Sequence, residues 1–173
     1  MSPPPLLQAA IDALNGLVKT KENLTVGTRV LDRLESLVHV SRAAKAPDVK
    51  VTDVVITTQT LPGNVGEVTQ VTAKTGDFGQ YNTRITLSPK PGFKCTCPDL
   101  EKRHAACKHV AALAVVTRKR FWALSDLLQA DIEKLGKERD ELEALYISVP
   151  LLTRNLTTKA GDALTSALKT LES

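Results

Sequence analysis

The first 46 residues place apolar side chains at helical spacing. One apolar stripe consists of Leu7, Ile11, Leu14 and Val18. A second stripe consists of Val30, Leu34, Leu37 and Val38. Steps of three and four residues put the members of each stripe on one face of a helix. Because residues 19–23 between the stripes are polar, the pattern predicts two helices that form a hairpin, and residues 1–46 as an N-terminal domain.

Residues 47–121 change to β-branched residues that are punctuated by turn sequences. The pattern predicts strands over residues 49–58, 67–74, 81–87 and 93–97, with turns at residues 61–66, 75–79 and 89–92. Alternation is clearest in the third strand, where Tyr81, Thr83, Ile85 and Leu87 share one face. The short connections favour antiparallel neighbours, so we expect a small antiparallel meander in this second domain.

Residues 122–173 return to helical periodicity and form the predicted C-terminal helical region. Leu128, Leu135 and Leu142 recur every seven residues, with Leu145 beside them. Gly136 interrupts this series, which favours an antiparallel packing helix over a coiled coil. Self-association of two chains through these leucines is the alternative.

The limits of the C-terminal helices are less clear from the pattern. A new helix capped near Ser125 and one continuous helix from Lys108 both fit the sequence. The dipeptide at residues 149–150 contains a proline, which predicts a break before a last amphipathic helix.

Composition sets limits on the core and the location. Apolar residues make up 42% of the 173 residues but aromatic residues only 3%, so the core must be built mainly from aliphatic side chains. No run reaches the length of a membrane span, and the N-terminus has no signal-peptide pattern, so we expect no membrane association.

Basic residues are concentrated in one part of the chain. Residues 84–120 hold nine basic and two acidic residues, a formal charge of +7, although the whole chain carries only +4. A basic segment of this kind suits phosphate backbones or an acidic protein surface. Solvated lysines without a partner are the alternative interpretation.

All three cysteines of the chain lie within thirteen residues, at Cys95, Cys97 and Cys107, and His109 follows. The pattern Cys-x-Cys, nine residues, Cys-x-His offers four ligands for a tetrahedral zinc ion. Residues two apart in a strand point to the same face, so Cys95 and Cys97 can reach one ion. Residues two apart in a helix diverge, so Cys107 and His109 can share that ion only where a helix begins.

Two other interpretations of these residues remain open. The three cysteines could simply be small buried apolar side chains. A disulfide framework is unfavourable, because the number of cysteines is odd and a Cys-x-Cys pair is too short to form a disulfide easily. His104 could replace His109 as the fourth ligand, although a position in the 99–106 loop is more typical of a surface residue. Thiolate ligands require a reducing compartment, which predicts a cytoplasmic or nuclear protein.

The segment CTCPD…CKHVAAL resembles the SWIM-type zinc finger family, including the Pro-Asp after the second cysteine and the lysine before the histidine. The resemblance covers about residues 65–120 and implies one zinc per chain, held by Cys95, Cys97, Cys107 and His109 in a ββα unit. It also implies a module that binds DNA or other proteins. The expected fold is thus α+β: a small antiparallel β-meander leads into a ββα zinc-binding unit, flanked by an N-terminal helical hairpin and C-terminal amphipathic helices.

The leading functional hypothesis is a non-enzymatic protein that binds nucleic acid, with DNA favoured. Its candidate phosphate contacts are Lys94, Lys102, Arg103, Lys108, Arg118, Lys119 and Arg120. The second hypothesis is a protein-interaction adaptor or dimerising subunit in which zinc is purely structural. An enzyme is disfavoured, because four protein ligands leave no open zinc position for water or substrate.

Overall fold

The computed structural model describes residues 3–60 and 67–171, with side chains up to residue 148 and at residues 158 and 159. The contacts divide the chain into two compact units, of which Thr20–Leu128 forms one, and Met1–Lys19 with Gln129–Ser173 forms the other. The predicted turn at residues 61–66 lies outside the described residues. The Thr20–Leu128 unit contains the sheet and the cysteine cluster.

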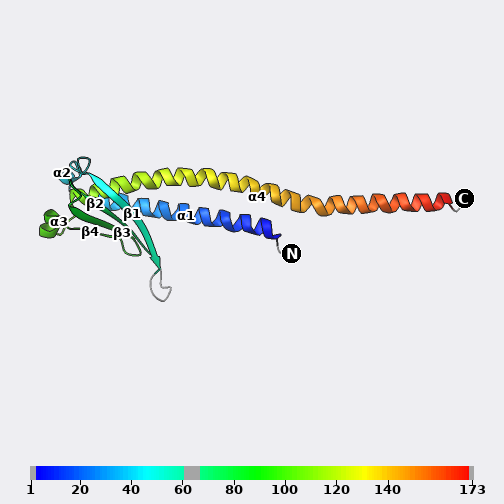
Figure 1. The fold of residues 1–173 in the computed structure, drawn as a ribbon, viewed down its shortest axis with the longest axis horizontal. Coiled ribbons are helices and arrows are strands. Elements are labelled where there is room, and N and C mark those ends of the chain that lie inside the picture. The colour runs from blue at the N-terminus through cyan, green and yellow to red at the C-terminus, as the bar shows by residue number, and fades with distance from the viewer. Residues whose placement is uncertain (1–2, 61–66, 172–173) are drawn as a thin grey trace. The chain divides into compact units, whose positions relative to one another are not determined.

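Four antiparallel strands form one sheet in the order β1-β2-β3-β4 (Figure 1). The strands are β1 (Val51–Thr60), β2 (Glu67–Thr75), β3 (Tyr81–Ser88) and β4 (Gly92–Cys95). Sequential neighbours pair with one another, which confirms the predicted meander and the α+β fold class. The β2–β3 turn uses Gly76 and Gly79 at φ of 94° and 66°, values that glycine adopts without strain.

Helices precede and follow the sheet. They are α1 (Pro5–Ser36), α2 (Val40–Ala43), α3 (Pro98–Arg103) and α4 (Lys108–Leu171). The predicted N-terminal hairpin is wrong, because α1 runs without interruption through residues 19–23. Those residues are polar but include neither glycine nor proline, so nothing in them stops a helix.

The C-terminal part of the chain is one helix. Of the two alternatives, the helix that is continuous from Lys108 is confirmed. The predicted break at residues 149–150 is wrong, because α4 contains Pro150 within its span. Leu128, Leu135 and Leu142 are half-buried, whereas Leu145 is exposed.

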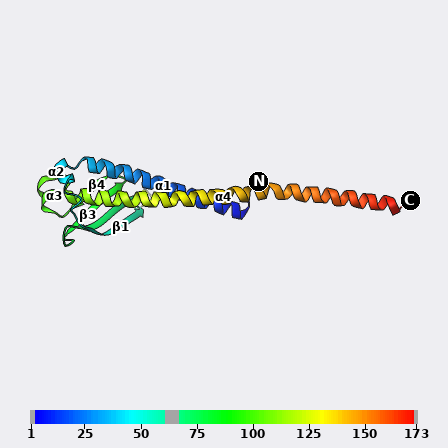
Figure 2. The same cartoon turned by 90° about the horizontal axis from the view of Figure 1, so that it is seen from above.

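The core of the Thr20–Leu128 unit lies between the sheet and the two long helices. The inner face of the sheet contributes Val71, Ile85 and Leu87 to one buried cluster. The helices complete it with Leu31 and Leu34 of α1 and with Val110, Ala111, Leu113 and Ala114 of α4. In this unit α1 and α4 run side by side in both views (Figures 1 and 2).

The approach of α1 to α4 depends on a glycine. A Cβ atom on Gly27 would lie 2.6 Å from Cε2 of the buried Phe121 ring. Glycine within a helix costs about 1 kcal/mol relative to alanine. At this position it leaves room for an aromatic ring, so the close packing offsets the unfavourable helix propensity.

Candidate metal centre

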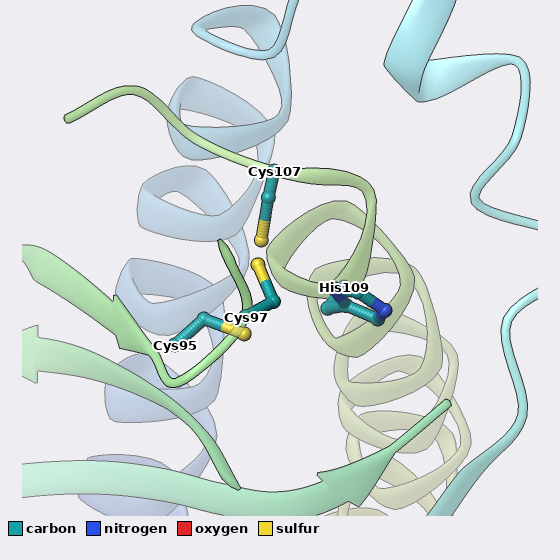
Figure 3. Close-up of side chains that lie close together, drawn as sticks. All are labelled: Cys95, Cys97, Cys107 and His109. Atoms are coloured by element: carbon teal, nitrogen blue, oxygen red, sulfur yellow. The ribbon is translucent and has the colours of Figure 1, made fainter. Parts of the chain in front are cut away.

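Four side chains converge where β4 ends and α4 begins (Figure 3). One ligand atom from each of Cys95, Cys97, Cys107 and His109 lies within 4.8 Å of every other, and all four residues are buried. Cys95 ends β4, and Cys97 directly precedes α3. Cys107 directly precedes α4, and His109 lies in its first turn. The Cys-x-His pair therefore spans a helix start, as its spacing requires.

A short helix returns the chain from the first pair of ligands to the second. Pro98 occupies the first turn of α3, a position that suits its fixed φ. His104 ends α3 in the left-handed conformation with φ 52°, and its N–H donates to the Leu100 carbonyl at 2.8 Å. His104 is exposed and lies outside the cluster, so the structure brings His109 and not His104 to the sulfurs.

Each sulfur accepts a hydrogen bond from a nearby backbone N–H. The donors are Cys97 for Cys95, Leu100 for Cys97 and Val110 for Cys107. Backbone donors that point at a sulfur favour its thiolate form, which is the form that binds a metal. The fold of the loop therefore supplies both the ligands and part of their charge stabilisation.

A buried chain of hydroxyl groups continues from Cys95 into the sheet. Thr83 Oγ1 lies 3.3 Å from Cys95 Sγ and 2.8 Å from Thr75 Oγ1. Hydrogen bonds from Cys107, His109, Thr83 and the Cys97 backbone lower the pKa of Cys95 to about 3, against the opposing effect of burial. These hydrogen bonds favour the thiolate form of Cys95, the form that binds a metal.

The other two thiols hold their protons in the absence of a metal. Burial raises the pKa of Cys97. The hydrogen bond to Cys95, together with burial, raises the pKa of Cys107. Three sulfurs packed this closely cannot all carry a negative charge unless a cation joins them. Cys95, Cys97 and Cys107 would hold such a cation, and a zinc ion there would favour the ionised form of all three thiols.

His109 also fits a metal ligand. Its Nδ1 atom is buried and has no hydrogen-bond partner among the described residues. A buried polar atom without a partner is costly, and a metal ion is a partner that satisfies an imidazole nitrogen. The Tyr81 ring lies 4.7 Å from the His109 ring, centroid to centroid, and helps to fix its orientation. The donor set and the geometry therefore fit one structural zinc per chain.

The loop is also held from outside by α2. Arg42 Nε lies 3.2 Å from Asp99 Oδ2, and Arg42 Nη1 donates to the Ala106 carbonyl at 3.4 Å. Arg103 reaches the other oxygen of Asp99 at 3.3 Å. These contacts join α2 to α3 and to the residue before Cys107, so α2 takes part in shaping the zinc loop.

Comparison with known proteins agrees with this geometry. Residues 94–116 match the SWIM zinc finger family. The match contains all four members of the cluster, and it confirms the resemblance seen in the sequence. No curated protein and no solved structure matches the chain. The match therefore defines the class of the metal centre, a SWIM-type zinc finger, and covers only this segment of the chain.

The predicted phosphate contacts divide into separate groups in the structure. Lys94 lies on the outer face of the sheet, and Lys102 and Arg103 lie on α3. Lys108 begins α4, whereas Lys119 and Arg120 lie about three turns further along it. All six are exposed, and Arg120 Nη1 donates to the Val54 carbonyl at 3.3 Å. The cations around the zinc centre are thus distinct from those along the helix.

Arg118 differs from the rest of the predicted set. Its Nη1 atom lies 2.9 Å from Asp32 Oδ1 and 2.6 Å from Glu35 Oε2. Its guanidinium carbon lies 5.2 Å from the centroid of a Trp122 ring. The contacts with Asp32 and Glu35 raise the pKa of Arg118. In the structure Arg118 thus joins α4 to α1, and its guanidinium group already contacts two carboxylates.

Two further cations beside the zinc centre were not predicted from the sequence. An open cavity of about 720 Å³ lies between the outer sheet face and α3. Lys74 and Arg84 line this cavity with Lys94, and Arg84 pairs with Lys94 across β3 and β4. The alternation of strand residues could have identified them, because Lys74 and Arg84 each lie between two buried residues of their strand and therefore on the opposite face of the sheet.

Replacing Thr83 with valine tests the role of the hydroxyl chain. Valine keeps the shape of the side chain and removes the hydrogen bond to Cys95. Loss of a side chain that hydrogen-bonds to a metal ligand typically lowers metal affinity by about 10–100-fold. We expect Thr83→Val to lower zinc affinity by about that factor, measured by competition with a chromogenic chelator.

The matched control is Thr86→Val, which lies on the same strand with its side chain on the opposite face. It should leave zinc affinity unchanged, and circular dichroism should show that both variants are folded. If Thr83→Val and the unsubstituted protein have the same zinc affinity in this competition, the hydroxyl groups of Thr83 and Thr75 do not contribute to metal binding.

Proposed function

We propose that this protein is a non-enzymatic, zinc-stabilised nucleic-acid-binding protein, with DNA as the favoured ligand. The observation that carries the proposal is a set of three exposed lysines around the zinc centre: Lys94 on β4, Lys102 on α3 and Lys108 on α4. None of the three has a carboxylate within ion-pair distance in the described part of the chain. A zinc ion held by the cluster would fix the elements that carry these charges.

Unpaired lysines on a rigid frame suit a polyanion. Their charges are not neutralised internally, so binding a phosphate releases counterions without first breaking an ion pair. The cations along α4, Lys119 and Arg120, extend the potential contact surface. Contacts of this kind read the backbone and not the bases, so the proposal includes strong salt dependence and weak sequence specificity.

The same zinc geometry argues against catalysis. A catalytic zinc keeps a coordination position for water or substrate. Three sulfurs and one imidazole would supply all four ligands of a structural zinc, so the site would serve as a folding element. Thiolate ligands persist in a reducing compartment, which supports a cytoplasmic or nuclear location. None of the helices in the described ranges combines the length and apolarity that a bilayer crossing requires.

The proposal is tested by neutralising the three lysines together, as Lys94→Gln, Lys102→Gln and Lys108→Gln in the full-length zinc-loaded protein. Each phosphate contact contributes about 0.9 to the slope of log affinity against log salt for duplex DNA. We expect the triple variant to bind more weakly and its slope to fall by about 2–3. Fluorescence anisotropy with duplex DNA, single-stranded DNA and RNA over a salt series measures both quantities.

The matched control removes three other exposed lysines, as Lys19→Gln, Lys90→Gln and Lys137→Gln, and so makes the same change in net charge. It should reduce affinity much less than the first triple variant. Equal loss in both variants would indicate a non-specific charge effect, and absence of binding to all three ligands would contradict the proposal itself.

A protein-interaction adaptor is the second candidate, and exposed apolar residues on α4 favour it. Leu127, Leu145 and Ile147 are each about 60% exposed. Leu128, Leu135 and Leu142 are half-buried already, so an interface would use the exposed residues more than the predicted heptad series. Light scattering on the full chain and on Leu145→Glu would distinguish the cases, because a dimer joined through the exposed side of α4 that carries Leu145 would dissociate.

A further inference from the structure

A second cavity lies on the other side of α3 from the sheet. It measures about 340 Å³, within the range of about 300–1,000 Å³ that ligand pockets occupy. Its wall is formed by three elements: α2 with the turn that follows it, α3, and the start of α4. His109 of the zinc centre borders it. The other residues that line it are Ser41, Arg42, Lys45, Asp99, Arg103 and Lys108.

The charges in this cavity are strongly unbalanced. Four cations face one carboxylate, Asp99, and that carboxylate is shared by Arg42 and Arg103. Lys45 and Lys108 have no ion-pair partner among the described residues. The neighbouring zinc centre removes only part of this excess, because three thiolates around a divalent ion leave a single negative charge. The cavity stays cationic with zinc in place.

The arrangement of these cations suits a tetrahedral anion. Asp99 holds two guanidinium groups at fixed positions, so little conformational entropy is lost when a further anion approaches. The two lysines bring mobile ammonium groups to the same space, and it is also lined by Ser41, whose hydroxyl oxygen lies 2.9 Å from His39 Nδ1. The Val110 N–H of α4 donates to Cys107 and is not free for a ligand, so side chains would carry this site.

We propose that this cavity binds one phosphate group of the nucleic-acid backbone, directly beside the zinc centre, and that α2 thereby belongs to the binding site. The proposal rests on the proposed function for the identity of the ligand. It adds Lys45 and Ser41, which lie outside the segment that matches the SWIM zinc finger. The phosphate is oriented by Arg42 and Arg103 and neutralised by Lys45 and Lys108.

Lys45→Gln in the full-length zinc-loaded protein gives the sharpest test. Its side chain is exposed and makes no hydrogen bond in the described structure, so the fold and zinc content should not change. We expect weaker binding to duplex DNA and a decrease of about 0.9 in the salt slope. The control is Lys90→Gln, an equal charge change in the β3–β4 turn at the opposite end of the strands, which should leave the slope unchanged.

A second measurement tests the cavity without nucleic acid. Titration of the zinc-loaded protein with inorganic phosphate, followed by amide NMR, should shift Ser41, Lys45 and Lys108 together in a saturable way, and Lys45→Gln should weaken that binding. If no nucleic acid binds but phosphate does, the cavity is a phosphate site for a smaller ligand and the proposed function fails. If DNA binds and Lys45→Gln matches Lys90→Gln, the proposed function stands and the cavity proposal is overturned.

Discussion

Replacing Cys107 with serine is expected to remove zinc from the protein and to abolish cooperative unfolding of the Thr20–Leu128 unit. Cys107 is fully buried, and its sulfur accepts the Val110 N–H at the start of α4. Serine keeps the size but offers a hydroxyl group that does not ionise near neutral pH and binds zinc poorly. Structural zinc ions contribute on the order of 10 kcal/mol to the folding of small domains. A domain of ordinary stability, about 5–15 kcal/mol, would not tolerate losing most of that.

The measurement has two parts, zinc per chain by elemental analysis and thermal unfolding by circular dichroism. The control is His104→Asn, because His104 is exposed and asparagine tolerates its left-handed backbone at φ 52°. That variant should retain one zinc and unfold as the unsubstituted protein does. A Cys107→Ser protein that still holds one zinc would show that the cluster is not the metal site. Zinc loss in His104→Asn would instead make His104 a ligand.

The metal centre could be predicted from the sequence because its four ligands lie close together along the chain, in two pairs of meaningful spacing. Cys95 and Cys97 lie two positions apart, as do Cys107 and His109, and each spacing has a geometric meaning only at a strand end or a helix start. Both conditions hold in the structure. The strands were equally predictable, because alternation such as that of Thr83, Ile85 and Leu87 reports directly which face is buried.

The helices show what local pattern cannot reveal. Polarity at residues 19–23 indicates exposure, and exposure is compatible with a helix that crosses the surface, so α1 continues where a turn was expected. Pro150 has a strong local preference against a helix interior, yet α4 contains it. Gly27 carries no signal at all until Phe121, 94 positions later, is known to pack against it. Each of these features depends on more than the local sequence.

The ion pairs of Arg118 likewise could not be predicted from the local sequence. Arg118 stands between Thr117 and Lys119 in a basic run and looks like a surface cation. Its partners, Asp32 and Glu35, lie more than eighty positions away on α1, so no local rule could find them. Counting the charged residues of a segment gives its net charge, but it does not show which of those charges form ion pairs with residues elsewhere in the fold.

Arg118→Glu is therefore expected to destabilise the Thr20–Leu128 unit far more than a surface charge reversal would. The variant removes both ion pairs and the stacking on Trp122, and it places a third carboxylate beside two others on α1. Breaking a buried ion pair from one side costs about 3–5 kcal/mol. Asp32 is 52% exposed and Glu35 31% exposed, and Arg118 itself is 22% exposed, so solvent screens both ion pairs and we expect a smaller loss, about 2 kcal/mol.

Lys119→Glu is the matched control, since it makes the same charge change one residue further along α4 on an exposed side chain. Its unfolding free energy in urea should stay within about 0.5 kcal/mol of the unsubstituted protein. Adding Glu35→Lys to Arg118→Glu should restore part of the lost stability, because it re-forms one ion pair in the opposite orientation. Equal stability of Arg118→Glu and Lys119→Glu would contradict a structural role for Arg118 and return it to the candidate phosphate contacts.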